Sequence, residues 1–201
     1  MYKRQHITSA EGGMLITNDR KLYDLVKSKK AFGVDKSYNQ RDFPGKYDVK
    51  DLGINYRMSE IHAAIGVEQL KKVNTFLQLR ERNFNLLFNE LKDLNEISIL
   101  KNEKFFFSSS NYCLSIIFKN LNFRKRTKLI KLLNSKGIGT SIYYPKPVPL
   151  MTYYKKKYGL SEKEFPFASK ISYQSIALPV GPHVSISDIK YISKNIKNTL
   201  K

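Results

Sequence analysis

The sequence lacks the features of disulfide-bonded, membrane-spanning, secreted and fibrous proteins. Its 201 residues contain one cysteine, Cys113, so no disulfide can form within the chain, and neither metal nor thiol chemistry is indicated. No run of about 18 apolar residues occurs, which excludes a membrane-spanning helix, and residues 1–10 lack the apolar stretch of a signal peptide. Glycine and proline are too few for a disordered or fibrous chain. We therefore expect a soluble cytoplasmic protein with a sizeable core, no metal site and no membrane partner.

Acidic residues are also few: 17 against 36 basic ones, for a net charge of +19. A charge of this size is typical of proteins that bind nucleic acid or an anionic surface. Most of the cations are lysines spread along the whole chain, however, whereas nucleic-acid readers gather them on one face. A bias of the coding sequence toward A and T explains this composition, so a basic nucleic-acid-binding module is kept only as an alternative function.

The first third of the chain predicts two strands, a helix and a loop. Two short β-type runs, at 6–9 and 14–17, flank a double-glycine bend. Asp19 and its neighbours offer N-cap chemistry to a helix over about 20–30. Residues 32–48 carry two glycines and a proline without any period, so we expect a long loop, which is often functional.

A long amphipathic helix is predicted next. Ser59 can cap it, and apolar residues recur seven apart from Leu70 to Leu91, so that one face stays apolar. We interpret it as a spine helix packed on sheets, with a coiled coil as the alternative. The rest of the chain alternates strand patterns with helical ones, which is typical of a small α/β layer domain. The strand patterns lie at 112–118, 138–144 and 176–178, and the helical ones at about 124–136, 167–175 and 187–200.

Three clusters could carry chemistry, and each also has a purely structural explanation. His6 stands before the double-glycine bend, where a hydrogen-bonded spectator is the plainer interpretation. Asn55 and Arg57 precede the start of a helix. This position can bind an anion, because the free N–H groups and the dipole of the helix add to the charge of the arginine. An ordinary cap of a surface helix explains the motif equally well. Tyr143 and Tyr144 end a strand before rigid prolines, which suits a pocket wall or an edge-strand terminator.

Four motifs occur in a recognisable order. They are Ile-Thr-Ser-Ala-Glu-Gly-Gly-Met-Leu-Ile-Thr-Asn-Asp at 7–19, Asn-Tyr-Arg-Met-Ser-Glu-Ile-His-Ala-Ala-Ile-Gly at 55–66, Tyr-Pro-Lys-Pro at 144–147 and Ser-Ile-Ala-Leu-Pro-Val at 175–180. In this order and at these separations the chain resembles the DegT/DnrJ/StrS family of PLP-dependent nucleotide-sugar aminotransferases. The resemblance covers essentially all of the sequence.

The resemblance implies an α/β fold, namely the C-terminal part of a PLP-dependent transferase fold type I subunit. It implies a remnant of the PLP-binding large domain at 1–70, a connecting spine helix at 71–95 and a small C-terminal α/β domain at 96–201. Such subunits work as homodimers with active sites at the interface. They move an amino group from glutamate to a keto group of a nucleotide-linked sugar, in polysaccharide or surface-glycan biosynthesis.

The resemblance also implies roles for individual residues. Asn55 and Arg57 match the family residues that reach the cofactor phosphate of the neighbouring subunit. Tyr143 and Tyr144 fall where the family walls the sugar pocket. A histidine that is common in the family a few residues further on is replaced by Pro149.

Gln5 occupies the position of the lysine that the family bonds to PLP. An amide forms no Schiff base and has no basic nitrogen, although family dehydratases with histidine at this position use PMP as a bound coenzyme. His6 is adjacent, but neighbours in extended chain point to opposite faces; Lys3, on the same face as Gln5, is the other candidate. We expect PLP as the cofactor, without covalent attachment.

The family's subunit is much longer, and its N-terminal half holds the groups that seat the pyridine ring and the phosphate. We therefore expect a truncated or split product, inactive alone, in which the apolar faces of the helix at 20–30 and of the early spine helix lie uncovered. The alternative is a non-catalytic partner that docks on a full-length homologue, as a heterodimer, and lends it Asn55 and Arg57. The sugar, the carbon that reacts and the choice between aminotransferase and dehydratase stay open.

Overall fold

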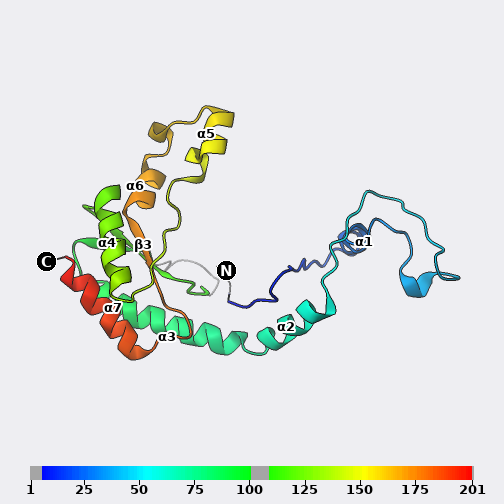
Figure 1. Cartoon of the computed structure of the whole chain (residues 1–201), viewed down its shortest axis with the longest axis horizontal. Coiled ribbons are helices and arrows are strands. Elements are labelled where there is room, and N and C mark those ends of the chain that lie inside the picture. Colours follow the sequence, from blue (N-terminus) through cyan, green and yellow to red (C-terminus); the bar gives the residue numbers. More distant parts are fainter. Residues whose placement is uncertain (1–5, 101–108, 201) are drawn as a thin grey trace. The chain divides into compact units, whose positions relative to one another are not determined.

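The computed structural model describes residues 6–100 and 109–200, and it divides the chain into two compact units (Figure 1). We call Met1–Lys72 the N-terminal unit and Val73–Lys201 the C-terminal unit. The division falls between two helices, α2 (Glu60–Leu70) and α3 (Val73–Leu91). The finer division at 70 and 95 stays a prediction.

A three-stranded antiparallel sheet in the order β1-β2-β3 lies at the centre of the C-terminal unit. Its strands are β1 (Ile97–Ile99), β2 (Leu114–Phe118) and β3 (Ser175–Leu178). In the central strand, Ile116 pairs with Ile99 on one side and with Ile176 on the other. Buried and half-buried residues alternate along β2, as expected of a strand with one face on the core.

Helices cover this sheet and close the core. α3 packs along α7 (Ile186–Asn198), and α4 (Phe123–Ser135) packs against α6 (Pro166–Gln174). The remaining elements of the unit are α5 (Thr152–Tyr158) and the 3₁₀ turns η2 (Val148–Leu150) and η3 (Glu162–Glu164). Apolar side chains of α3, α4, α7 and all three strands form one buried cluster, so the C-terminal unit has a core of its own.

The N-terminal unit is built differently. It contains α1 (Arg20–Lys29), the 3₁₀ turn η1 (Tyr38–Gln40) and α2. Within residues 6–72, Gly33 is the one buried residue, and neither helix buries a side chain. Ile61 on α2 is 74% exposed. The predicted uncovered apolar faces are therefore confirmed, and no hydrophobic core within the described residues holds this unit together.

Several predicted elements are confirmed to within about two residues. They are the helices α1, α4, α6 and α7 and the strands β2 and β3. The local chemistry agrees with the helix ends: the Asp19 carboxylate accepts a hydrogen bond from the Lys21 N–H at 2.8 Å, Asn122 caps α4, and Gly137 follows α4 with φ of 75°. The mixed α/β class is thus present as expected.

The predicted spine helix is not continuous. After Leu70 the N–H of Lys72 bonds to the Gln69 carbonyl at 3.1 Å, three residues back, so the chain tightens into a turn before α3 begins. Leu70 and Leu77 keep their spacing of seven across the break, and periodicity alone therefore misses it. The coiled-coil alternative is not supported, because α3 buries Leu87 and Leu91 against α7 and the sheet.

Three predicted strands are wrong. Residues 6–9 and 14–17 form no strand, because β propensity yields a strand only where a second one supplies hydrogen bonds, and the described part of the N-terminal unit offers only isolated bridges. Residues 138–144 form a single bridge, Ser141 to Ala177, since the chain turns away before Pro145. Conversely, the sequence patterns missed β1 and α5.

Candidate functional site

Asn55 and Arg57 stand at the end of a loop whose base is closed by backbone hydrogen bonds. The N–H of Ile54 donates to the Lys29 carbonyl at 2.8 Å, and the N–H of Tyr56 donates to the Lys30 carbonyl at 2.9 Å. An antiparallel bridge joins Ala31 to Asn55. The carbonyls at the end of α1, which need partners outside the helix, thus hold the Asn-Tyr-Arg segment in place.

Two glycines allow the arms of this loop to approach closely. Gly33 has φ of 73°, and a Cβ there would lie 1.9 Å from the Asp51 carbonyl oxygen. A Cβ on Gly53 would lie 2.1 Å from the Gly33 nitrogen. Because these obstacles are backbone atoms, no rotamer change can relieve them. The sequence predicted a loop here, because the segment has no regular pattern. It did not predict that Gly33 and Gly53 lie against each other.

We predict that Gly53→Ala will open the base of the loop. A methyl group against backbone atoms costs about 2 kcal/mol, so the Ala31–Asn55 contact should disappear from nuclear Overhauser spectra, and trypsin should cut after Arg41 faster than in the parent chain. Gly13→Ala is the matched control, because nothing lies within 4 Å of a Cβ there. Unchanged spectra in Gly53→Ala would contradict the role of the glycine pair.

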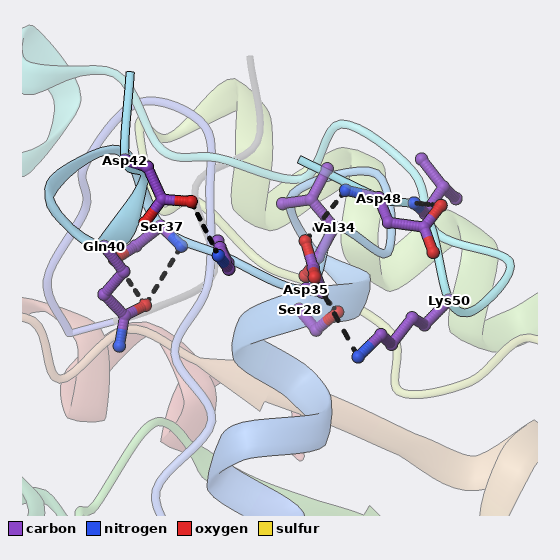
Figure 2. A network of polar contacts seen from close by, with 10 residues as sticks. Ser28, Val34, Asp35, Ser37, Gln40, Asp42, Asp48 and Lys50 are labelled. Atoms are coloured by element: carbon purple, nitrogen blue, oxygen red, sulfur yellow. Dashed lines mark hydrogen bonds and ion pairs between the residues drawn. The ribbon is translucent and has the colours of Figure 1, made fainter. Parts of the chain in front are cut away.

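Polar contacts hold the interior of the loop, as Figure 2 shows. The Asp35 carboxylate accepts a hydrogen bond from the Asp48 N–H at 2.9 Å and lies 3.9 Å from the Lys50 ammonium. The hydrogen bond from Asp48, and then the charge of Lys50, hold the pKa of Asp35 below its ordinary value. Asp42 pairs with Lys46 at 2.8 Å, and this hydrogen bond lowers its pKa as well. The loop is therefore shaped by ionised carboxylates rather than by apolar packing, and acid that protonates them weakens it.

Arg57 and Asn55 form a polar pair at the entry to α2. The Arg57 Nε donates to Asn55 Oδ1 at 3.2 Å, and the guanidinium lies 5.6 Å from the centre of the Phe32 ring. Both residues are exposed, and Ser59 caps α2 by accepting from the His62 N–H at 3.3 Å. Among residues 6–100 and 109–200 no carboxylate forms an ion pair with Arg57. Its charge therefore stays available to an external anion.

The bend of the first motif lies against the second motif. A Cβ added to Gly66 of α2 would lie 3.7 Å from the Ser9 side chain, and a Cβ added to Gly12 would meet the Met58 side chain. The bend itself is held by a hydrogen bond from the Ala10 N–H to the Thr8 hydroxyl at 3.1 Å. The two motifs, about forty residues apart in sequence, thus meet within the N-terminal unit. His6 is half-buried beside this bend, whereas Gln5 and Lys3 lie outside the described residues.

Tyr143 and Tyr144 belong to an aromatic cluster in the C-terminal unit. The Tyr143 hydroxyl lies 3.3 Å from that of Tyr112, and the rings of Tyr143 and Tyr144 meet edge to face with centres 5.8 Å apart. Arg80 of α3 donates to the Tyr112 carbonyl at 3.0 Å and is half-buried, which lowers its pKa. The sequence patterns missed Arg80 and Tyr112, because only the fold brings α3 beside the start of β2. Pro149 lies in η2, a few residues on.

The described residues offer neither a metal site nor a reactive thiol. Among the described residues, no three His, Cys, Asp or Glu side chains gather as a metal ion would require, and no helix is long and apolar enough to cross a bilayer. Cys113 is half-buried with its sulfur 3.6 Å from the Ser115 hydroxyl, and burial raises the pKa of the thiol. A protonated thiol is a poor nucleophile.

Comparison with solved structures assigns the fold. The structure of Helicobacter pylori PseC, an aminotransferase involved in the biosynthesis of pseudoaminic acid, superposes with a TM-score of 0.83 at 26% identity, over 97% of this chain and 50% of that one. The fold and motifs thus define an α/β part of a fold type I sugar aminotransferase subunit, as expected from the sequence. The profile of the DegT/DnrJ/EryC1/StrS aminotransferase family matches residues 1–197, and the chain belongs to this family.

Curated relatives agree with this assignment. The chain is 32% identical to GDP-perosamine synthase of Escherichia coli O157:H7 over 94% of its own length and 48% of that protein. It is 27% identical to the UDP-4-amino-4,6-dideoxy-N-acetyl-beta-L-altrosamine transaminase of Campylobacter jejuni serotype O:2, over 97% of this chain and 50% of that protein. The chain therefore spans about half the length of the relatives it matches.

Proposed function

We propose that this chain serves PLP-dependent amino transfer to a nucleotide-linked keto sugar in the synthesis of a polysaccharide or surface glycan. In this proposal it acts in the cytoplasm, glutamate is the amino donor, and the chain contributes to a site shared between subunits. The observation that carries the proposal is the exposed Arg57–Asn55 pair at the start of α2, which has no carboxylate partner among the described residues. Such a pair fits the phosphate of a cofactor bound by a neighbouring subunit.

The residues present fit the phosphate of PLP but not a covalent bond to it. PLP, when bound, supplies the electron sink that amino transfer needs. Arg57 and Asn55 hold and orient an anion, while Tyr143 and Tyr144 offer an aromatic wall for a sugar. The amide of Gln5 can neither bond covalently to PLP nor shuttle a proton. We therefore propose that the chain alone does not transaminate.

A second candidate function is that of a non-catalytic partner for a full-length homologue. It is favoured by the N-terminal unit, in which no apolar side chain is buried within residues 6–72. Leu52 is 91% exposed, and both helices leave their apolar faces open. A surface of this kind is normally covered by another polypeptide. Docking there would place Arg57 at the interface between the two chains.

Mixing with an impaired relative tests both candidates. We expect the chain to restore activity about tenfold or more to a full-length family member whose matching arginine has been replaced by methionine, because a charged hydrogen bond contributes about 1.5–3 kcal/mol. The same chain with Arg57→Met should not restore it. Arg20→Met removes another exposed arginine, on α1, and is the control that should behave like the parent chain.

The outcomes of that experiment separate the candidates. Restoration by the Arg57→Met chain would refute the assigned role of Arg57. Native mass spectrometry shows whether a mixed dimer forms. If it forms but activity is not restored, the docking function is supported and the catalytic function is refuted. If no mixed dimer formed over a range of concentrations, the docking function would be wrong as well.

A further inference from the structure

We infer that the exposed face of α4 is a docking surface for an anionic lipid bilayer. The inference does not depend on the amino-transfer function proposed above, since it concerns a different surface and a different chemistry. We define the α4 basic face as Arg124, Lys125, Lys128 and Lys131.

The acidic residues of the chain are not distributed evenly. Residues 109–161 contain no aspartate or glutamate, although the whole chain has 17. A bias toward lysine codons adds cations everywhere but does not clear carboxylates from one stretch. The cations of this stretch are Lys119, Arg124, Lys125, Arg126, Lys128, Lys131, Lys136, Lys146, Lys155, Lys156 and Lys157. A local field of one sign is the footprint of an anionic partner.

The helix geometry gathers four of these cations on one side. Positions 124, 128 and 131 follow the spacing of one helical stripe, with Lys125 beside it, and all four side chains are exposed. The opposite side of α4 carries Arg126, Leu129 and Leu133, which are buried. The α4 basic face is therefore a continuous strip turned to solvent.

In the described part of the chain, these four charges have no carboxylate partner. No ion pair among the described residues involves any of the four. Arg124 and Lys125 lie in the first turn of α4, where the helix dipole disfavours cations, and this turn contains no acidic residue. Within the described residues these four cations are therefore not engaged in ion pairs, and their charge is available to an external partner.

The neighbouring apolar groups favour a bilayer over a nucleic acid. Leu132 follows Lys125 and Lys128 by seven and four residues, so it shares their side of α4, and it is 45% exposed. Such a side chain can enter the interface between headgroups. One face of the Phe123 ring is already covered by the Arg126 guanidinium, 5.3 Å from its centre. Lys157 covers the exposed Tyr153 ring of α5 in the same way, at 5.6 Å. Stacked bases need aromatic faces, and these two rings each have one face covered. The side of α4 that carries the cations presents an aliphatic side chain instead, which suits a lipid interface.

Vesicle sedimentation tests the inference on the full chain. We expect it to sediment with vesicles of phosphatidylcholine containing about 30% phosphatidylglycerol and not with phosphatidylcholine alone, because each surface cation strengthens binding about fivefold. Lys128→Glu with Lys131→Glu should weaken binding about tenfold or more. The matched control is Lys190→Glu with Lys194→Glu on α7, which changes the net charge equally at exposed positions, and it should weaken binding less than about threefold.

Two results would contradict binding of the α4 basic face to a bilayer. Equal loss in the two double variants would show that net charge rather than the α4 basic face is responsible. Tighter binding to a single-stranded oligonucleotide than to vesicles at equal phosphate concentration, lost in the α4 variant, would assign the face to nucleic acid. Sedimentation without vesicles and circular dichroism spectra check that each variant is soluble and folded. The neutral pair Lys128→Gln with Lys131→Gln provides a second, milder variant.

Discussion

Replacing Leu91 by alanine will lower the free energy of unfolding of the C-terminal unit by about 3 kcal/mol. Leu91 is 0% exposed within the cluster formed by α3, α7 and the sheet. Truncation removes its transfer free energy and leaves a cavity that rigid neighbours on the sheet fill only in part. The expected shift is large relative to the total stability of a domain of this size.

Urea unfolding followed by circular dichroism measures this shift. The matched control is Leu70→Ala, since Leu70 belongs to the same predicted apolar stripe but is 52% exposed on α2. We expect the control to change the free energy of unfolding by less than about 0.5 kcal/mol. Equal destabilisation by the two substitutions would mean that the N-terminal unit has a cooperative core after all.

The second large effect concerns position 5. The test uses a complex of this chain with a polypeptide that matches the first half of its relatives. We expect this complex to transfer amino groups only when the chain carries Gln5→Lys. The substitution should raise the rate of amino transfer by a factor on the order of a thousand or more. The physical reason is that only an amine can bond covalently to PLP and then act as a base at the reacting carbon. Borohydride reduction followed by mass spectrometry locates any bond to the cofactor.

The control for this experiment is Gln5→Asn, which keeps the amide and should stay inactive. Trapping of PLP on Lys3 in the parent chain would refute the proposal that this chain attaches no cofactor. Amino transfer by the parent complex, without any substitution, would refute the assignment of Gln5 to the lysine position. Recovery of the complex by size exclusion is required in both arms, so that a failure to assemble is told apart from a failure of chemistry.

Local chemistry made some elements predictable. Asp19 and Asn122 are side chains that accept hydrogen bonds from free N–H groups, and each begins the helix that the sequence predicted. Gly137 ends α4 because its backbone adopts φ of 75° at no steric cost. The motif around Asn55 and Arg57 was likewise recognisable, since both residues lie close together in sequence and at a helix start.

Features that depend on distant partners were not predictable in the same way. Residues 6–9 have strand propensity but find no second strand among the described residues, and Ile97–Ile99 becomes β1 only because β2 lies beside it. Arg80 contacts Tyr112, and Tyr112 contacts Tyr143, and each of these contacts spans more than thirty residues of sequence. Such contacts follow from packing and leave no periodic trace.

The sequence by itself determined the family, the class of the fold and the ends of α1 and α4, because these reside in side-chain chemistry and short-range spacing. The tertiary structure alone decided that the apolar stripe from Leu70 to Leu91 is buried only in its second half. It also left Arg124, Lys125, Lys128 and Lys131 of α4 exposed to solvent while it buried Arg126. The reason is physical: periodicity states which side chains share a face, but burial depends on whether another surface lies against that face.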